Sequence, residues 1–185
     1  MTPPLQGPAD PPLGAVIVDR ESIRRRVGEL AVELERAYAA CERPLVLVCV
    51  LKGSLLFTAD LARALTIPVE IEFVSCRSYG DGTTSSGAVQ LIKDVSMSLR
   101  DRDVLMVEDI IDTGMTTSFL RDHLATHHPR SLRLVALLDK LAHRQRPVEV
   151  NFRGFEIPDR FVVGYGLDLA ERHRNLPDVH VIDGL

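Results

Sequence analysis

Acidic residues and a turn of small residues stand together in the middle of the chain. Glu108 and Asp109 follow the apolar run at residues 104–107, Asp112 follows two isoleucines, and residues 113–117 read Thr-Gly-Met-Thr-Thr. Backbone N–H groups at a helix start favour phosphate, and carboxylates can bind hydroxyls, a metal or a proton. We therefore expect a sugar-phosphate site at the carboxyl end of one strand, where open α/β sheets bind ligands.

The elements that must position this site alternate along the chain. Asp19 is a candidate N-cap for a helix whose apolar residues Ile23, Val27, Leu30 and Leu34 share one face. Further helices are expected at residues 55–65 and 116–127, and strands at 15–18, 44–51, 69–73, 103–107, 132–138, 148–150 and 161–163. This alternation predicts an α/β fold, an open and mostly parallel twisted sheet flanked by helices.

Other chemically capable residues follow neighbouring strands of the expected sheet. Lys52-Gly53 ends the strand at 44–51, Asp139-Lys140 ends the strand at 132–138, and Asp168 lies beyond the last strand. Acids and lysines on one rim suit a polyanionic, metal-bound substrate. The P-loop and dinucleotide-binding glycine patterns are absent from the sequence.

Composition limits the possible classes of protein. The 185 residues suit a single domain at 15–185, preceded by a loose Pro-rich arm at 1–14. The net charge of −4 argues against nonspecific binding of nucleic acid. No apolar run reaches transmembrane length, and the Pro-rich start does not resemble a signal peptide. Three cysteines, an odd number in or near apolar segments, predict reduced thiols and a cytoplasmic protein.

Some motifs have two readings. The polar segment at 77–87, with Ser78 and Tyr79, is either a surface connection or a lid. Arginines 24–26 are interpreted as a solvated helix face. His123 and His127 are spaced like a metal pair, but no Glu follows the first as in a zincin helix, so we expect exposed helix residues.

The segment Glu108-Asp109-Ile110-Ile111-Asp112-Thr113-Gly114-Met115-Thr116 resembles the phosphoribosyl-diphosphate (PRPP) motif of type I phosphoribosyltransferases, most of all the hypoxanthine-guanine enzymes. Leu51-Lys52-Gly53, Ser78-Tyr79, Asp139-Lys140 and residues 154–168 resemble the same family in the same order. The resemblance covers residues 15–185. It implies the type I phosphoribosyltransferase fold, with a small hood lobe built from the N- and C-terminal segments, and a non-proline cis peptide at Leu51-Lys52.

The resemblance also implies a role for each matching residue. Glu108 and Asp109 would lie near the ribose hydroxyls, and Lys52 and Arg174 would contact the diphosphate. Asp112 would be the general base or proton shuttle at purine N7. The 5′-phosphate cradle and PRPP site would also include Gly53, Thr113, Gly114, Met115, Thr116 and Thr117.

The purine half of the site is implied in the same way. Lys140 would donate to the 6-oxo group, Phe161 would stack on the base, and Val162 would contact its edge through backbone groups. Asp168 would bind Mg²⁺ and border the purine, and Ser78-Tyr79 would form the lid. Met115 stands where some relatives carry Lys or another polar residue, which bears on affinity more than on activity.

Two functions therefore remain open. The first is purine salvage, the transfer of the 5-phosphoribosyl group from PRPP to hypoxanthine or guanine to give IMP or GMP and diphosphate. The second is a regulatory RNA- or protein-binding protein that keeps the PRPP fold. The three residues Asp112, Lys140 and Asp168, and the lack of a basic stripe, favour the enzyme. The small-molecule substrates would be PRPP and a 6-oxopurine, with no nucleic-acid or membrane partner and with a homo-oligomer, a dimer or tetramer, as the common state among relatives.

Overall fold

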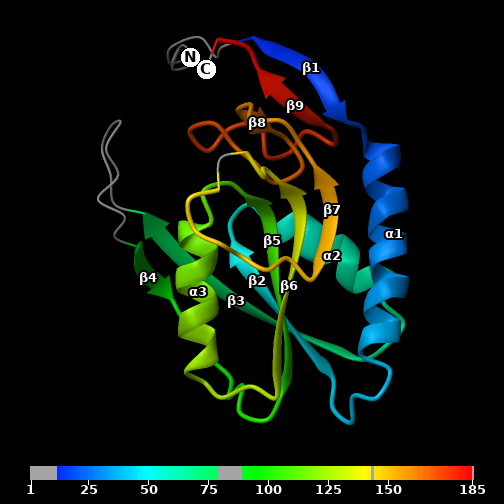
Figure 1. Cartoon of the computed structure of the whole chain (residues 1–185). Helices are drawn as coiled ribbons and strands as arrows, with labels where there is room; N and C mark the ends of the chain where they lie inside the picture. The colour runs from blue at the N-terminus through cyan, green and yellow to red at the C-terminus, as the bar shows by residue number, and fades with distance from the viewer. Residues whose placement is uncertain (1–11, 79–88, 143, 185) are drawn as a thin grey trace, which may run out of the picture.

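A computed structural model describes residues 12–78, 89–142 and 144–184 (Figure 1). Within this part of the chain the elements are β1 (Leu13–Val18), α1 (Arg20–Ala37), β2 (Leu45–Leu51), α2 (Leu55–Ala64), β3 (Val69–Ser78), β4 (Val89–Lys93), β5 (Asp103–Ile111), α3 (Met115–Ala125), β6 (Ser131–Asp139), β7 (Phe152–Glu156), β8 (Val162–Val163) and β9 (Val179–Ile182). Residues 1–11 of the expected Pro-rich arm lie outside the described residues, and Leu13 and Gly14 belong to β1. Of the expected lid, Tyr79 lies outside the described residues and Ser78 is the last residue of β3.

The main sheet is the predicted open, mostly parallel one. Its strand order is β4-β3-β2-β5-β6-β7, and only β4 runs antiparallel to its neighbour. The two central strands are almost entirely buried, which explains their nearly unbroken apolar sequences. This arrangement confirms the predicted fold class.

Helices cover both faces of the sheet. Leu47 and Leu105 pack in one core cluster with α1 and α2, whereas Val46 and Val104 pack in a second cluster with α3. Adjacent strand residues point to opposite faces, so each central strand contributes to both clusters. The six-stranded sheet is therefore the middle layer of a three-layer structure (Figure 1).

A second, three-stranded sheet lies beyond the carboxyl ends of the main strands. Its order is β1-β9-β8, and both pairings are antiparallel, so the first described strand lies beside the last (Figure 1). This small sheet is the hood lobe that the family resemblance implied. It places the segments before and after β8 above the rim where the acidic residues lie.

Helix α1 has the N-cap and the buried apolar face that the sequence predicted. The Asp19 side chain accepts a hydrogen bond from the Ser22 backbone N–H at 2.8 Å, which satisfies one of the free donors at the helix start. The predicted apolar face is buried and includes Ile23, Val27, Leu30 and Leu34. Arg26 departs from the expected solvated face, since it is half-buried and donates to the carbonyls of Arg153 and Gly154.

Several predicted boundaries were wrong. The strand expected at 103–107 continues to Ile111, because pairing with β6 extends through Ile110 and Ile111. Glu108 and Asp109 therefore lie within β5 and not after it. The strand expected at 148–150 is absent, and the last strand beside β6 is β7, at 152–156. Strands β4 and β9 were not predicted, and β8 is shorter than the expected 161–163.

In β3 the apolar residues Val69, Ile71 and Phe73 alternate with Glu70 and Glu72, a pattern typical of a strand with one exposed face, but the observed burial does not follow this pattern. Ile71, expected on the covered face, is 42% exposed. Glu70 and Glu72 are only half-exposed because the segment after β4 covers them. Glu70 pairs with Arg102 at 2.9 Å, and Glu72 accepts hydrogen bonds from Ser96.

The interpretation of the two histidines was also wrong. Helix α3 spans Met115–Ala125 and not 116–127, so only His123 lies within it. Both side chains are partly buried, and the Nε2 atom of each faces Asp94. Spacing along the helix could not reveal this partner, which comes from the segment after β4.

Candidate active site

Glu108 is a buried carboxyl group at the centre of the sheet's rim. Its side chain accepts a hydrogen bond from the Thr117 hydroxyl at 3.3 Å, which links β5 to the first turn of α3. Burial raises the pKa of Glu108 well above its ordinary value, the neighbouring Asp109 raises it further, and the Thr117 hydrogen bond opposes the rise. Glu108 is therefore poised to hold a proton until a donor or cation approaches.

Asp109 is the point where three segments converge. Its Oδ1 accepts the Ile110 backbone N–H at 2.9 Å, and its carboxylate lies where a Cβ atom on Gly53 would stand. Gly166, at φ +102°, in turn packs its α-carbon against the Gly53 carbonyl. Glycine is required at both positions because any side chain there would overlap the neighbouring segment.

The electrostatic surroundings of Asp109 favour a neutral or cation-bound state. Burial raises its pKa to about 6, against the lowering effects of the Ile110 hydrogen bond and of Arg174, and nearby Asp168 adds to the rise. Three carboxyl groups, Glu108, Asp109 and Asp168, thus share one site, where a neighbouring acid raises the pKa of Glu108 and of Asp109. A ligand that carries hydroxyl donors or a divalent cation would stabilise their ionised forms.

The turn from Asp112 to Thr117 has the form of an anion-binding loop. Gly114 adopts the left-handed conformation, φ +80°, and caps the start of α3. The Thr113 carbonyl accepts hydrogen bonds from the backbone of Gln145 and Arg146, at 2.9 and 3.0 Å, which fix the turn. The helix start therefore presents backbone N–H groups beside the acids, the arrangement that binds phosphate.

A cavity of about 280 Å³ opens between these segments. Its lining contains most of the residues selected from the sequence, namely Lys52, Gly53, Glu108, Asp109, Asp112, Thr113, Gly114, Thr116, Thr117, Asp168 and Arg174. It also contains residues that were not selected, namely Val50, Leu51, Cys76 and Ile110. Leu51 and Ile110 lie within the two family motifs although no role was assigned to them, whereas Val50 and Cys76 belong to no motif and reach the rim through the register of β2 and β3.

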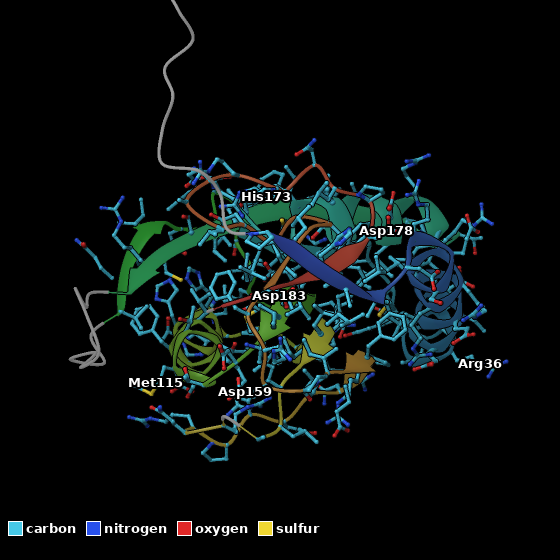
Figure 2. All side chains as sticks on the ribbon, turned by 90° about the horizontal axis from the view of Figure 1, so that it is seen from above. Arg36, Met115, Asp159, His173, Asp178 and Asp183 are labelled. Atoms are coloured by element: carbon cyan, nitrogen blue, oxygen red, sulfur yellow. The ribbon has the colours of Figure 1, made fainter. Side chains whose placement is uncertain are left out.

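Met115 is separated from the cavity. Its side chain points away from the sheet (Figure 2) and borders a different hollow with Val89 and Phe119. Its backbone N–H lies 3.4 Å from the Thr113 hydroxyl, within the turn. The side chain at this variable position therefore does not shape the main cavity.

Charged residues at the mouth of the cavity are paired with one another. Lys52 Nζ lies 2.9 Å from Glu171 Oε1, and Arg174 Nη2 lies 2.8 Å from Asp168 Oδ1. The Leu51–Lys52 peptide bond is cis, as the resemblance implied. Glu171 was not selected from the sequence, since nothing in its local context marks it as a partner of Lys52.

The residues expected to bind a purine lie on the adjoining side of the rim. Lys140 is nearly buried, and its Nζ lies 3.4 Å from Asp112 Oδ2 and 3.7 Å from Asp159 Oδ1. Val162 is buried in β8, while Phe161 is 39% exposed beside it. Lys140, Phe161 and Val162 do not line the 280 Å³ cavity, so the rim has two adjoining parts joined by the Asp112–Lys140 contact.

A buried ionic cluster holds Lys140 in place. Asp139 is fully buried and pairs with Arg144 and with Arg153, whose Nε lies 2.7 Å away. The Lys140 backbone N–H also donates to the Ile111 carbonyl at 3.0 Å. Asp139 therefore supports the turn that carries Lys140 and does not face the cavity.

None of the described helices has both the length and the apolar character needed to cross a membrane.

Residues 16–170 match the family model of the phosphoribosyl transferase domain. The chain belongs to the phosphoribosyltransferase family.

Within that family, the proteins similar to this chain include hypoxanthine-guanine phosphoribosyltransferases. It is 45% identical over 173 residues to the Mycobacterium avium enzyme of that name, covering 91% of this chain and 85% of that protein. It is 44% identical to the Aquifex aeolicus enzyme, covering 91% and 94%. The crystal structure of a Bacillus anthracis hypoxanthine-guanine phosphoribosyltransferase superimposes with a TM-score of 0.86 at 40% identity, covering 92% of this chain and 99% of that one.

Proposed function

We propose that this protein transfers the 5-phosphoribosyl group from PRPP to hypoxanthine or guanine, forming IMP or GMP and diphosphate. The observation that carries the proposal is the contact between Lys140 and Asp112. It joins Lys140, a hydrogen-bond donor suited to the 6-oxo group of a purine, to residues 112–117, the phosphate loop. The names of the similar proteins describe the same activity. The function is that of a purine salvage enzyme.

The phosphoribosyl half of the substrate is assigned to the acid-lined cavity. Residues 112–117 hold the 5′-phosphate through backbone N–H groups and hydroxyls at the start of α3. Glu108 and Asp109 face the two ribose hydroxyls. A raised pKa suits this role, since each carboxyl can accept a hydroxyl hydrogen bond when ionised and donate one when neutral.

The purine half is assigned to the adjoining side of the rim. Asp112 accepts or shuttles the proton at purine N7, and Lys140 donates to the 6-oxo group. Phe161, partly exposed, offers a ring face to the base, and Val162 offers backbone groups at its edge. An amino group at the purine 6-position would face the Lys140 ammonium donor to donor, so Lys140 selects oxopurines.

The carboxylates fit a magnesium ion. Asp168 is the proposed ligand, because it adds a hard oxygen donor to the cavity and because its proximity already raises the pKa of Asp109. When bound, Mg²⁺ neutralises charge on the departing diphosphate. Lys52 and Arg174 contact the diphosphate, exchanging their present partners Glu171 and Asp168 for the ligand.

The order of charge movements follows from this placement. As diphosphate leaves, positive charge develops on the ribose ring, and the nearby carboxylates stabilise that positive charge. The purine nitrogen forms the new bond to C1, and Asp112 takes up the purine proton. The cations at the cavity mouth stabilise the negative leaving group at the same time.

The assembly and location are further parts of the proposal. A Trypanosoma cruzi relative has been studied for the role of its C-terminal region in its oligomeric state, which supports a homo-oligomer here, a dimer or tetramer. Light scattering coupled to gel filtration would measure it. All three cysteines are free thiols, which supports a location in the cytoplasm.

Diphosphate release from PRPP with hypoxanthine, guanine, xanthine, adenine and uracil tests the function. Turnover is expected with hypoxanthine or guanine and not with adenine or uracil. Activity with none of the bases would favour the alternative, a regulatory protein that binds RNA or another protein. Activity with adenine alone would contradict the role of Lys140.

A further inference from the structure

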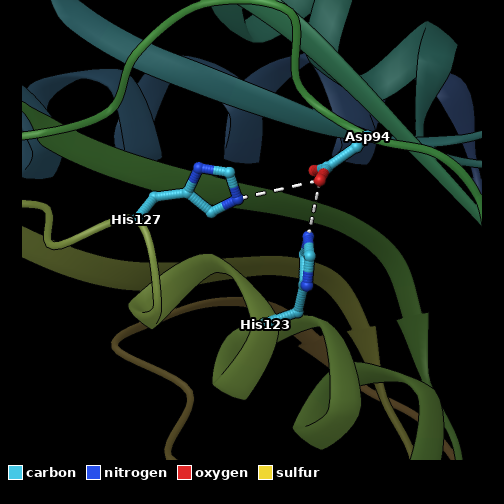
Figure 3. Close-up of side chains that lie close together, drawn as sticks. All are labelled: Asp94, His123 and His127. Carbon is cyan, nitrogen blue, oxygen red and sulfur yellow. Dashed lines mark ion pairs between the residues drawn. The ribbon is translucent and has the colours of Figure 1, made fainter.

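Three possible metal ligands meet at the end of α3 opposite the phosphate loop. Asp94 follows β4, His123 lies in the last turn of α3, and His127 lies two residues beyond the helix (Figure 3). Asp94 Oδ2 is 2.9 Å from His123 Nε2 and 3.8 Å from His127 Nε2. One ligand atom from each residue lies within 4.8 Å of the others.

The three side chains are held in this orientation by their neighbours. Asp94 Oδ1 accepts the Val95 backbone N–H at 2.8 Å, which leaves Oδ2 facing both imidazoles. The Phe119 ring lies nearly parallel to His123, with centroids 6.5 Å apart. The two imidazole rings meet edge to face at 5.3 Å. A carboxylate and two histidines with supported orientations are thus present before any ion arrives.

The donor set matches zinc in chemistry and dimensions. Zinc is bound by imidazole nitrogen and carboxylate oxygen at about 2.0–2.2 Å, which places tetrahedral ligands about 3.3 Å apart. The 2.9 and 3.8 Å separations lie on either side of that value. The side chains are between a quarter and two-fifths exposed, so an ion and a completing water can enter from solvent.

We propose that Asp94, His123 and His127 form a zinc site distinct from the active site. Two nitrogen donors favour zinc over magnesium, which prefers an oxygen shell. The bound ion would join the segment after β4 to the end of α3. The alternative is that Asp94 only contacts the two imidazoles and that no ion binds. The experiment below distinguishes these two cases.

The site's effect should be on stability and not on catalysis. His123 lies six residues after Thr117, so at 1.5 Å per residue about 9 Å of helix separates it from the phosphate loop, and none of the three ligands lines the active-site cavity. Zinc would bind the folded chain in preference to the unfolded one, in which the Asp94 segment and α3 are apart. Zinc should therefore raise the melting temperature.

The test measures zinc retention by the full chain. Chelator-treated protein is mixed with equimolar zinc in excess Mg²⁺, which occupies the active-site carboxylates, and is then desalted and assayed for zinc. His123→Gln, His127→Gln and Asp94→Asn are compared with wild type. The matched control is His128→Asn, because His128 is exposed at φ +55° and Asn tolerates that conformation.

The wild type and His128→Asn should retain one zinc per chain and melt at a higher temperature with zinc. Each ligand variant should bind zinc at least about tenfold more weakly in competition with a chelating dye. Absence of zinc from the wild type would overturn the proposal. So would unchanged zinc affinity in both histidine variants, since the ion would then lie elsewhere. His127→Gln, beyond the end of α3, keeps the test valid if His123→Gln unfolds.

Discussion

Replacing Asp109 with Asn should stabilise the protein at neutral and alkaline pH while impairing activity. The carboxylate is enclosed by Gly53 and by the neighbouring acids, and its pKa in the folded chain is about 6 against an ordinary value of 3.8. Asn keeps the shape of the side chain and an oxygen for the Ile110 N–H. It cannot ionise, so it removes the cost of a buried negative charge.

The magnitude follows from the two pKa values. Between pH 3.8 and about 6 the folded protein keeps a proton that the unfolded chain has released, so the free energy of unfolding falls as pH rises through this window. At 1.36 kcal/mol per unit of pKa, the rise from 3.8 to about 6 corresponds to about 3 kcal/mol. Asp109→Asn should recover this amount at about pH 8 and almost none of it below about pH 4.

The assay is urea unfolding of wild type and Asp109→Asn across this pH range. The matched control is Asp122→Asn, an exposed carboxylate on α3, which should leave the free energy of unfolding nearly unchanged. If Asp109→Asn is no more stable than wild type at about pH 8, the ionised Asp109 carboxylate does not destabilise the folded chain. Equal stabilisation by Asp109→Asn at all pH values would also refute the reasoning.

Asp112→Asn should lower turnover far more than PRPP affinity, because the amide cannot take up the purine proton; equal losses of both, or normal turnover in steady-state kinetics, would contradict that role. Lys140→Met should raise the activation free energy with hypoxanthine by about 1.5–3 kcal/mol through loss of a charged hydrogen bond, which lowers kcat/KM roughly 10- to 150-fold. Unchanged kcat/KM would exclude Lys140 from base recognition. Gly53→Ala should abolish activity and lower the melting temperature, since its Cβ would overlap Asp109. Gly28→Ala, a helix position with open space, should instead stabilise the fold by about 0.5–1 kcal/mol; similar melting curves for the two variants would refute the close approach at Gly53.

The sequence predicted the centre of the sheet well because buried parallel strands leave a plain signal. Residues 45–51 and 104–107 are unbroken apolar runs, and the acids and glycines after them marked the rim. The edges were predicted poorly. Strand β7 reads Phe-Arg-Gly-Phe-Glu, and its mixed polarity belongs to a strand covered less completely than the centre. Such strands depend on a neighbour to pair with, which a local pattern does not specify.

The candidate site, too, was only partly predictable from the sequence. Residues 108–117 were recognisable because the motif is contiguous, and the common rim correctly brought Lys140 beside Asp112. The pairing of Lys52 with Glu171, and of Asp94 with two histidines, joins positions remote in the sequence. Charge and periodicity do not identify such partners. They follow from the register of the sheet and from the path of the segments that cross its edge.

The product that the purified chain forms from PRPP and hypoxanthine with Mg²⁺ decides whether the protein has the proposed function. The proposed function predicts IMP and diphosphate in equal amounts, with IMP formation nearly lost in Asp112→Asn although PRPP still binds. Diphosphate released without IMP, or IMP formed at the wild-type rate by Asp112→Asn, would contradict it.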